Sequence, residues 1–178
     1  MNIIKTLYRM KHALIIIFAL LLTLPLFSQD EKSSETSTYY FIRHAEKDRS
    51  DTSNHNPCLL EKGKLRAEHW ASVFKNINFD IVYSTDYHRT KETAKPTAIK
   101  NNIGLTLYDP REHDVADFLK DTKGKTVLVV GHSNTTPQFV NSLLGKAKYD
   151  DIDDNNNANL YIVTISNDAV SDTLLLID

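Results

Sequence analysis

Three short segments of this chain place a histidine or an arginine directly after an apolar run. The first is Arg43-His44, which follows Tyr39-Tyr40-Phe41-Ile42. A run of aromatic and β-branched residues predicts a buried strand. A cation and a titratable imidazole at the exit of such a strand are costly unless an anionic group uses them. Taken alone, the pair also fits a strand that simply ends in surface residues.

The other two segments strengthen the chemical interpretation. Ser84 to Thr90, which contains Arg89, follows the apolar run at Ile81, and Gly131-His132 follows the run that starts at Thr126. The carboxyl ends of parallel strands meet at one edge of a sheet, where two arginines, two histidines and two helix N-termini would favour phosphate. The chain has no Walker loop, and Ser133 lacks a G-x-S-x-G elbow, so a histidine is the remaining candidate nucleophile.

The elements that must position these residues alternate between strands and helices, which predicts an α/β fold with a largely parallel sheet. The β-branched run from Thr126 to Val130 is typical of a central parallel strand. Pro96 should kink or shorten the helix that contains it. We expect strands at 38–42, 81–83, 105–108, 126–130, 160–165 and 169–175. We expect helices at 59–75, 115–119 and 136–144, the last with Thr136 as N-cap, and a loop followed by a helix over 85–100.

The first 28 residues have the pattern of a secretory signal. Three basic residues precede the apolar stretch from Ala13 to Phe27, and the small residue Ser28 follows it. We expect cleavage near Ser28, a flexible lead-in over residues 29–37, one domain over 38–178, and export to the periplasm or beyond the cell. The alternative is an uncleaved anchor, although the stretch is shorter than the ~20 residues of a spanning helix. No cysteine follows closely enough for a lipoprotein anchor.

Composition excludes some classes of function. Beyond residue 28 the chain has 18 basic and 23 acidic residues, a net charge of −5 that argues against a nucleic-acid binder. Cys58 is the only cysteine, so no intramolecular disulfide forms, and we interpret it as chemically inert. The acidic segment 150–157 partly mimics a calcium loop but lacks its glycine and its final glutamate, which indicates a solvated loop. Nothing in the sequence indicates the oligomeric state.

In four motifs the sequence resembles the histidine phosphatase superfamily, the phosphoglycerate-mutase-like proteins, and in particular their short, minimal branch. The resemblance spans residues 38–166 and implies a three-layer sandwich around a mostly parallel central sheet. The matching motifs are Arg43-His44-Ala45-Glu46, Leu60-Glu61-Lys62-Gly63 with Arg66-Ala67, Ser84 with Arg89 and Thr93-Ala94, and Gly131-His132.

The resemblance also implies roles for the site residues. His44 would be the nucleophile, neutral at the attacking nitrogen and held at the other by a hydrogen bond, for instance to a backbone carbonyl. Arg43, Arg89 and His132 would hold the phosphoryl oxygens. No metal or other cofactor is required by this chemistry. Ser84 and His88 are further candidates for substrate binding, with a loop-structuring serine and a surface histidine as the alternatives.

The proton donor for the leaving group is the least defined role. The resemblance implies a carboxyl after the strand that follows Arg89, and Asp109 fits that place best. Glu112 and Asp114 are close enough in sequence to compete. Asp109 could equally belong to an ordinary Asp-Pro turn with Pro110.

Together these features predict a metal-independent phosphomonoesterase that acts through a phosphohistidine on small phosphate esters outside the cytoplasm. The chain lacks the long insertions of cofactor-dependent mutases, so an open pocket and a protein-borne substrate are also admissible. The alternatives are a phosphohistidine or phosphoprotein phosphatase, a metal-dependent hydrolase built on His44, His132 and Asp109, and a phosphate-binding module without turnover.

Overall fold

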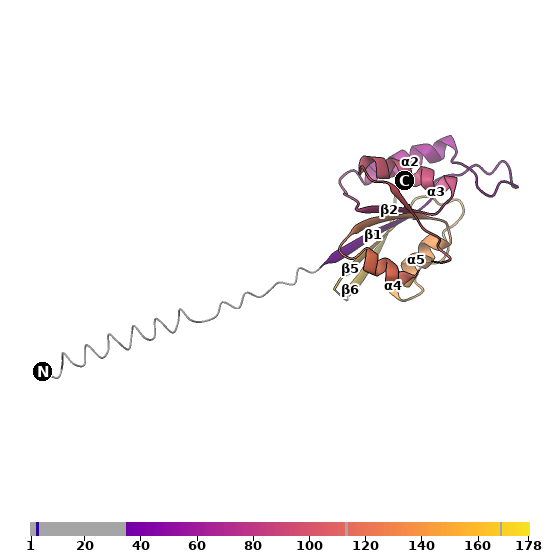
Figure 1. Ribbon diagram of the computed structural model, residues 1–178. Coiled ribbons are helices and arrows are strands. Elements are labelled where there is room, and N and C mark those ends of the chain that lie inside the picture. The colour runs from indigo at the N-terminus through magenta and orange to yellow at the C-terminus, as the bar shows by residue number, and fades with distance from the viewer. Residues whose placement is uncertain (1–2, 4–34, 113, 168) are drawn as a thin grey trace. The chain divides into compact units, whose positions relative to one another are not determined.

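The computed structural model describes residues 3, 35–112, 114–167 and 169–178, and a six-stranded sheet organises this part of the chain (Figure 1). The strand order is β3-β2-β4-β1-β5-β6. The first four strands in this order pair in parallel, whereas β5 and β6 are antiparallel to their neighbours. The strands are β1 (Thr36–Arg43), β2 (Ile81–Ser84), β3 (Leu105–Leu107), β4 (Thr126–Gly131), β5 (Asn159–Ser166) and β6 (Ala169–Leu176).

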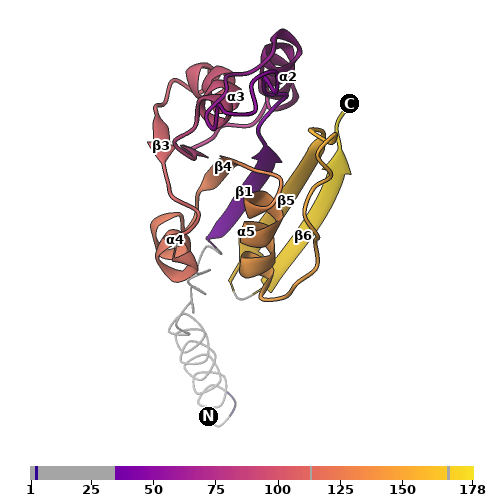
Figure 2. The ribbon, with the colours of Figure 1, turned by 90° about the vertical axis from the view of Figure 1, so that its right-hand side faces the viewer.

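Two pairs of helices cover the two faces of this sheet (Figure 2). Side chains of one pair contribute to one buried cluster, and side chains of the other pair contribute to the second. The helices are α2 (Glu61–Val73) and α3 (His88–Lys100) on one face, and α4 (Val115–Asp121) and α5 (Thr135–Leu144) on the other. The predicted α/β sandwich with a mostly parallel sheet is therefore confirmed.

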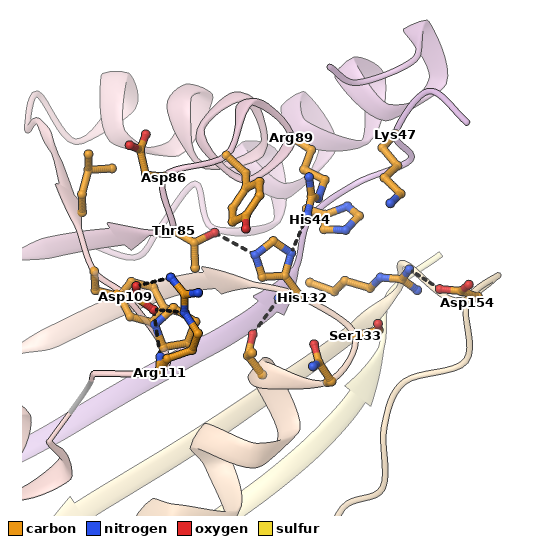
Figure 3. A pocket seen from close by; sticks show the side chains of 17 residues that line it. His44, Lys47, Thr85, Asp86, Arg89, Asp109, Arg111, His132, Ser133 and Asp154 are labelled. Atoms are coloured by element: carbon orange, nitrogen blue, oxygen red, sulfur yellow. Dashed lines mark hydrogen bonds and ion pairs between the residues drawn. The ribbon is translucent and has the colours of Figure 1, made fainter. Parts of the chain in front are cut away.

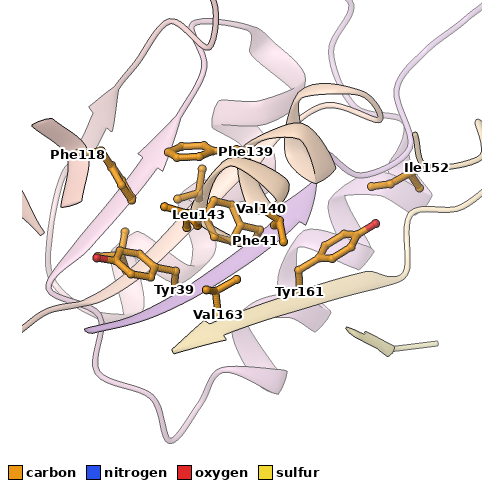
Figure 4. Close-up of a cluster of buried hydrophobic side chains, with 11 residues drawn as sticks. Tyr39, Phe41, Phe118, Phe139, Val140, Leu143, Ile152, Tyr161 and Val163 are labelled. Atoms are coloured by element: carbon orange, nitrogen blue, oxygen red, sulfur yellow. The ribbon is translucent and has the colours of Figure 1, made fainter. Parts of the chain in front are cut away.

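The central strand β4 shows why the sequence forms these layers. Val127 and Val129 belong to the buried cluster that includes Phe118 of α4 and Phe139 of α5. Figure 4 labels these two phenylalanines within the cluster. Leu128 and Val130 belong to the cluster beneath α2 and α3. A strand that is buried on both faces gains from apolar residues at every position rather than at alternate ones. Burial on both faces is therefore the physical reason for the unbroken apolar run at 126–130, from which β4 was predicted.

The structure corrects several element boundaries. β1 begins at Thr36, inside the stretch expected to be a lead-in, because Thr36 already pairs with Ser166 of β5. α3 ends at Lys100 as expected, and Pro96 lies inside it without interrupting the helix. α5 begins at Thr135 with Asn134 as N-cap, which corrects the expected N-cap at Thr136.

The predicted signal at 1–28 lies outside the described residues, apart from residue 3, and so does most of the lead-in. Within the described part of the chain, no helix combines the length and the apolar character needed to cross a bilayer.

A close approach between α2 and the segment after β1 supports the site. A Cβ built on Gly63 would lie 2.3 Å from the carbonyl oxygen of Glu46 and 3.0 Å from its amide nitrogen. Only a residue without a side chain allows this contact. The turn that follows His44 is therefore held against the first turn of α2.

Candidate active site

The carboxyl ends of β1, β2 and β4 open into a cavity of about 840 Å³ (Figure 3). The strands are level at this edge, because Arg43 pairs with Gly131 and Ser84 pairs with Val130. The prediction that three strand ends would bring two arginines and two histidines together is confirmed. The described residues that line the cavity are Arg43, His44, Lys47, Thr85, Asp86, Tyr87, Arg89, Leu107, Tyr108, Asp109, Pro110, Arg111, His132, Ser133, Asn134, Thr135 and Asp154.

His44 is held in one tautomer by its backbone surroundings. Its Nδ1 lies 2.7 Å from the carbonyl oxygen of Ala45. A carbonyl can only accept, so Nδ1 donates, and Nε2 of the neutral ring carries a lone pair. The backbone amide of His44 donates to the carbonyl of Gly131 at 2.9 Å, which fixes the residue against β4. The structure thus supplies the backbone hydrogen bond expected for the nucleophile.

Both cavity histidines are held in the neutral form. The pKa of His44 is lowered to about 3, mainly by burial and in part by the positive charges of Arg43 and Arg89, against the opposing hydrogen bond to Ala45. Burial, followed by the charges of Arg89, Lys47 and Arg43, lowers the pKa of His132 to about 4. A neutral imidazole is the form that can attack phosphorus.

Arg43 is fixed by the loop between α5 and β5. Its guanidinium is buried, and Nη1 donates to the carbonyls of Asp153 at 2.8 Å and Asn156 at 3.0 Å. Its Nη2 lies 2.9 Å from the carboxylate of Asp154. Its Nε is buried with no hydrogen-bond partner among the described residues. The cation is therefore oriented by three groups that lie about 110 residues further along the chain.

The same loop supports the backbone of the candidate nucleophile. The buried amide of Asn157 donates to the carbonyl oxygen of His44 at 2.8 Å. The expected solvated loop at 150–157 is therefore in part a supporting element of the site, which is a correction. Sequence spacing contains no signal for this role, since the contacts are formed only in the tertiary structure.

Arg89 and His132 lie side by side and share an aromatic neighbour. The guanidinium Nη2 of Arg89 lies 3.5 Å from Nδ1 of His132. The guanidinium carbon lies 4.3 Å from the ring centre of Tyr87, and that ring meets His132 edge-on at 5.1 Å. Tyr87 thus contacts both groups through its ring, a role that the sequence analysis did not identify.

A chain of hydroxyl groups sets the tautomer of His132. Because a guanidinium only donates, Nδ1 of His132 accepts from Arg89, and Nε2 donates to Thr85 Oγ1 at 2.9 Å. Thr85 Oγ1 in turn donates to Thr90 Oγ1, also at 2.9 Å. Thr85 is therefore a positioning residue for His132 that was missed from the sequence.

Two helices begin at the cavity. Tyr87, the N-cap residue of α3, and Asn134, the N-cap residue of α5, both line it, and neither side chain caps its helix. The amides at a helix start attract anions. Lys47 adds a further cation, whose pKa is lowered by burial and by the neighbouring Arg89 and Arg49. The electrostatics of the cavity therefore suit a phosphate group.

Two of the predicted substrate-binding residues do not line the cavity. The hydroxyl of Ser84 is buried and donates to the carbonyl of Thr85, and His88 is exposed at the start of α3, so neither residue lines the cavity. Their expected role in substrate binding is corrected by this placement. Glu46 pairs with Arg66 of α2 at 3.0 Å rather than with the arginines of the cavity.

Of the three candidate proton donors, only Asp109 lines the cavity. Hydrogen bonds from Arg111 lower the pKa of Asp109 to about 2. Glu112 and Asp114 line a different hollow, and Asp114 caps α4 by accepting from the amides of Ala116 and Asp117. A general acid must be protonated, whereas the contacts with Arg111 favour the carboxylate form of Asp109. This is a correction to its assignment as general acid.

The other two carboxylates that line the cavity in the described part of the chain are also ion-paired. Asp86 is bound by Lys91, and Asp154 is bound by Arg43 and Arg49, and in both residues these contacts lower the pKa.

The expected alternative of a metal centre on His44, His132 and Asp109 has no geometric support. Among the described residues, three potential ligands come within 4.8 Å of one another at Cys58, His88 and Glu92, outside this cavity.

Comparisons with known proteins agree with this geometry. The model of the histidine phosphatase superfamily (branch 1) matches residues 39–111, which include Arg43, His44 and Arg89. A search of curated protein sequences finds no significant match.

Solved structures share the fold at low sequence identity. The putative phosphohistidine phosphatase SixA from Agrobacterium tumefaciens is 17% identical, with a TM-score of 0.57 over 78% of this chain and 97% of that one. A phosphoserine phosphatase from Entamoeba histolytica is 17% identical, with a TM-score of 0.61 over 77% and 95%. A phosphoglycerate mutase from Bacillus anthracis is 16% identical, with a TM-score of 0.61 over 80% and 93%. Residues 39–111 therefore match the histidine phosphatase superfamily (branch 1), and the described fold is shared with a SixA phosphatase and a phosphoglycerate mutase.

Proposed function

We propose that this protein is a metal-independent phosphomonoesterase that acts through a phosphohistidine intermediate on His44. The observation that carries the proposal is the tautomer of His44. Nδ1–H of His44 donates to the carbonyl of Ala45 at 2.7 Å, so Nε2 carries the lone pair, and His44 lines a cavity that contains two buried arginines. A neutral nucleophile beside fixed cations is the arrangement that phosphoryl transfer requires.

The proposed reaction has two displacements at phosphorus. In the first, Nε2 of His44 forms a bond to phosphorus while the bond to the leaving oxygen breaks. Arg43, Arg89 and the α3 and α5 helix starts stabilise the charge on the other phosphoryl oxygens, and Lys47 extends this cationic surface. In the second, water attacks the phosphohistidine, His44 leaves as a neutral imidazole, and inorganic phosphate is released. The cations that this route needs are side chains of the chain, and its backbone amides add neutral hydrogen-bond donors.

The leaving group defines the substrate class. Each described carboxylate that lines the cavity is bound by a cation, and the pKa of each is lowered. A leaving group that departs as a stable anion, or that brings its own proton, needs little help from an acid. We therefore expect aryl and other activated phosphate esters to be better substrates than simple alkyl esters.

A phosphohistidine borne by a protein or peptide is a second candidate substrate. Because the carboxylates of the cavity are ion-paired, they do not supply a proton to the leaving group. The imidazole of a phosphohistidine substrate does not need one from the protein, because its other nitrogen can take a proton from solvent. The neighbour SixA is named for this activity. Hydrolysis of a phosphohistidine peptide at a higher kcat/KM than an aryl ester would select this candidate.

We also propose that the protein works outside the cytoplasm on small phosphate esters rather than nucleic acid. The support is the signal pattern of residues 1–28 and the net charge of −5 over the remainder. Amino-terminal sequencing of the exported protein should show a start near residue 29, and retention of residues 1–28 would favour the uncleaved anchor.

The central test is hydrolysis of 4-nitrophenyl phosphate by the full chain and by His44→Ala. We expect the wild-type activity to survive EDTA, to be blocked by vanadate, and to fall on the order of 10³-fold or more in the variant. His69→Ala, which removes an exposed imidazole of α2, is the matched control. Rapid quench should trap an acid-labile phosphoenzyme in the wild type. Phosphate binding without phosphoenzyme or turnover would instead indicate a binding module.

A further inference from the structure

A cluster of metal-binding side chains lies outside the cavity, where the segment before α2 meets the first turn of α3. The ligand atoms of Cys58, His88 and Glu92 all lie within 4.8 Å of one another. None of the three residues lines the cavity. His88 and Glu92 are four residues apart on α3 and therefore share one face of the helix. Cys58 reaches them from a separate segment, so the cluster joins two parts of the fold.

Hydrogen bonds already hold this cluster in place. The carboxylate of Glu92 accepts from the amide of Leu59 at 2.8 Å, which fixes one ligand beside Cys58. The amide of His88 donates to the side chain of Asn56, also at 2.8 Å. The thiol of Cys58 is hydrogen-bonded to Glu92, which, with the carboxylate charge, raises the pKa of the thiol. A divalent cation would take the place of the thiol proton that now lies between the sulfur of Cys58 and the carboxylate of Glu92.

We propose that Cys58, His88 and Glu92 form a binding site for a zinc-class divalent cation. One thiolate, one imidazole and one carboxylate are a ligand set that suits Zn²⁺ and not Mg²⁺ or Ca²⁺, which prefer oxygen. A tetrahedral site needs donor atoms on the order of 3.5 Å apart, from bond lengths of roughly 2.0–2.3 Å. Cys58 and His88 are exposed, so rotation of their side chains can close the remaining gap, with water as the fourth ligand.

The position of the site gives it a structural consequence. His88 directly precedes Arg89, and Nη1 of Arg89 lies 3.4 Å from the carbonyl of His55 in the same segment that carries Cys58. A cation bound across the cluster would tie this segment to α3 and hold the backbone on both sides of Arg89. The site is separate from the phosphatase chemistry, and its occupation can be measured in an enzyme that does not turn over.

The test is titration of the full chain with Co²⁺, which reports thiolate ligation by a charge-transfer absorption band in the near ultraviolet. We expect one equivalent to bind with this band, in the wild type and equally in His44→Ala, which removes a histidine from the cavity. Cys58→Ser, His88→Ala and Glu92→Gln should each lose the band, whereas the α2 controls His69→Ala and Glu68→Gln should keep it. Circular dichroism checks that each variant is folded.

A second readout uses the reactivity of the thiol. Zn²⁺ should slow the reaction of Cys58 with an aromatic disulfide reagent at least tenfold in the wild type and not in His88→Ala or Glu92→Gln. The proposal is overturned if no thiolate band forms, if His88→Ala keeps it, or if binding disappears in His44→Ala. Failure of these metal tests would leave the phosphatase proposal untouched, and loss of activity in His44→Ala would leave the metal site untouched.

Discussion

Arg111 binds Asp109 through both carboxylate oxygens, with Nη2 at 2.6 Å from Oδ2 and Nε at 3.0 Å from Oδ1. The backbone amide of Arg111 donates to the same carboxylate at 2.9 Å. These contacts lower the pKa of Asp109 to about 2 and so favour its ionised form. The carboxyl that the sequence offered as proton donor is therefore held as a carboxylate at the rim of the cavity.

This pairing predicts a strong dependence of rate on the leaving group. Across a series of aryl phosphates, kcat/KM should fall steeply as the pKa of the leaving phenol rises, because no positioned acid assists departure. Even for an ester whose leaving group has a high pKa, Asp109→Asn should lower kcat/KM by much less than the roughly 10²-fold that a general acid provides. In Arg111→Ala the pKa of Asp109 should rise, and kcat/KM should fall less steeply as the pKa of the leaving phenol rises. A shallow dependence in the wild type that steepens in Asp109→Asn would show that Asp109 does donate.

The stability of the protein should fall as the pH drops below 6.5. The pKa values of His44 and His132 are lowered to about 3 and about 4 in the folded state, so the unfolded chain binds more protons between those values and 6.5. Each histidine removes up to about 1.4 kcal/mol of stability per pH unit in this window. Urea unfolding at pH 7 and pH 4.5 measures the change.

His44→Asn should show a smaller difference in stability between these two pH values than the wild type, because one of the two groups is gone. His69→Ala controls for the loss of an imidazole as such. If the free energy of unfolding changed equally between pH 7 and pH 4.5 in His44→Asn and in the wild type, the burial of a neutral His44 would be contradicted.

Asn157 should contribute both to stability and to activity. Its buried amide donates to the carbonyl of His44, and Asn157→Ala leaves that carbonyl without this partner. The cost should be about 1–3 kcal/mol in the free energy of unfolding, measured with urea, and kcat should fall because His44 is less firmly held. Asn155→Ala, an exposed change in the same loop, should stay within about 0.5 kcal/mol of the wild type. Equal stability of the two variants would refute the supporting role of the loop.

Gly63 should not tolerate a side chain. An added Cβ would meet backbone atoms of Glu46 at 2.3, 3.0 and 3.1 Å, and backbone cannot move aside as a flexible side chain can. Gly63→Ala should cost about 1–3 kcal/mol of unfolding free energy and displace the turn after His44, with a loss of activity. Gly104→Ala is the matched control, because a Cβ there meets nothing within 4 Å. An unchanged melting temperature in Gly63→Ala would contradict the close packing of α2.

Most of the fold could be predicted because its signals are local. The unbroken run at 126–130 and the apolar runs at 38–42 and 81–83 each identify a strand from neighbouring residues alone. The start of β1 was missed because it depends on pairing with a distant strand. Thr36 joins β1 because Ser166 of β5 is its partner.

The convergence of His44, Arg89 and His132 could also be predicted, because parallel strands bring their carboxyl ends to one edge whatever the detailed packing. The groups that orient them could not be predicted. Asp154 and Asn157 act on Arg43 and His44 across about 110 residues of chain, and Thr85 reaches His132 through a side-chain rotamer.

By itself the sequence determined the order of strands and helices, the motif residues and the cationic character of the site, since each is a property of short segments. Only the tertiary structure decided that His44 keeps its lone pair on Nε2, that Arg111 keeps Asp109 ionised, and that Cys58 meets His88 and Glu92. These relationships depend on distances of a few ångströms between side chains from separate elements. Such distances are set by packing, burial and hydrogen bonding in the folded chain, which residue types and their spacing do not encode locally.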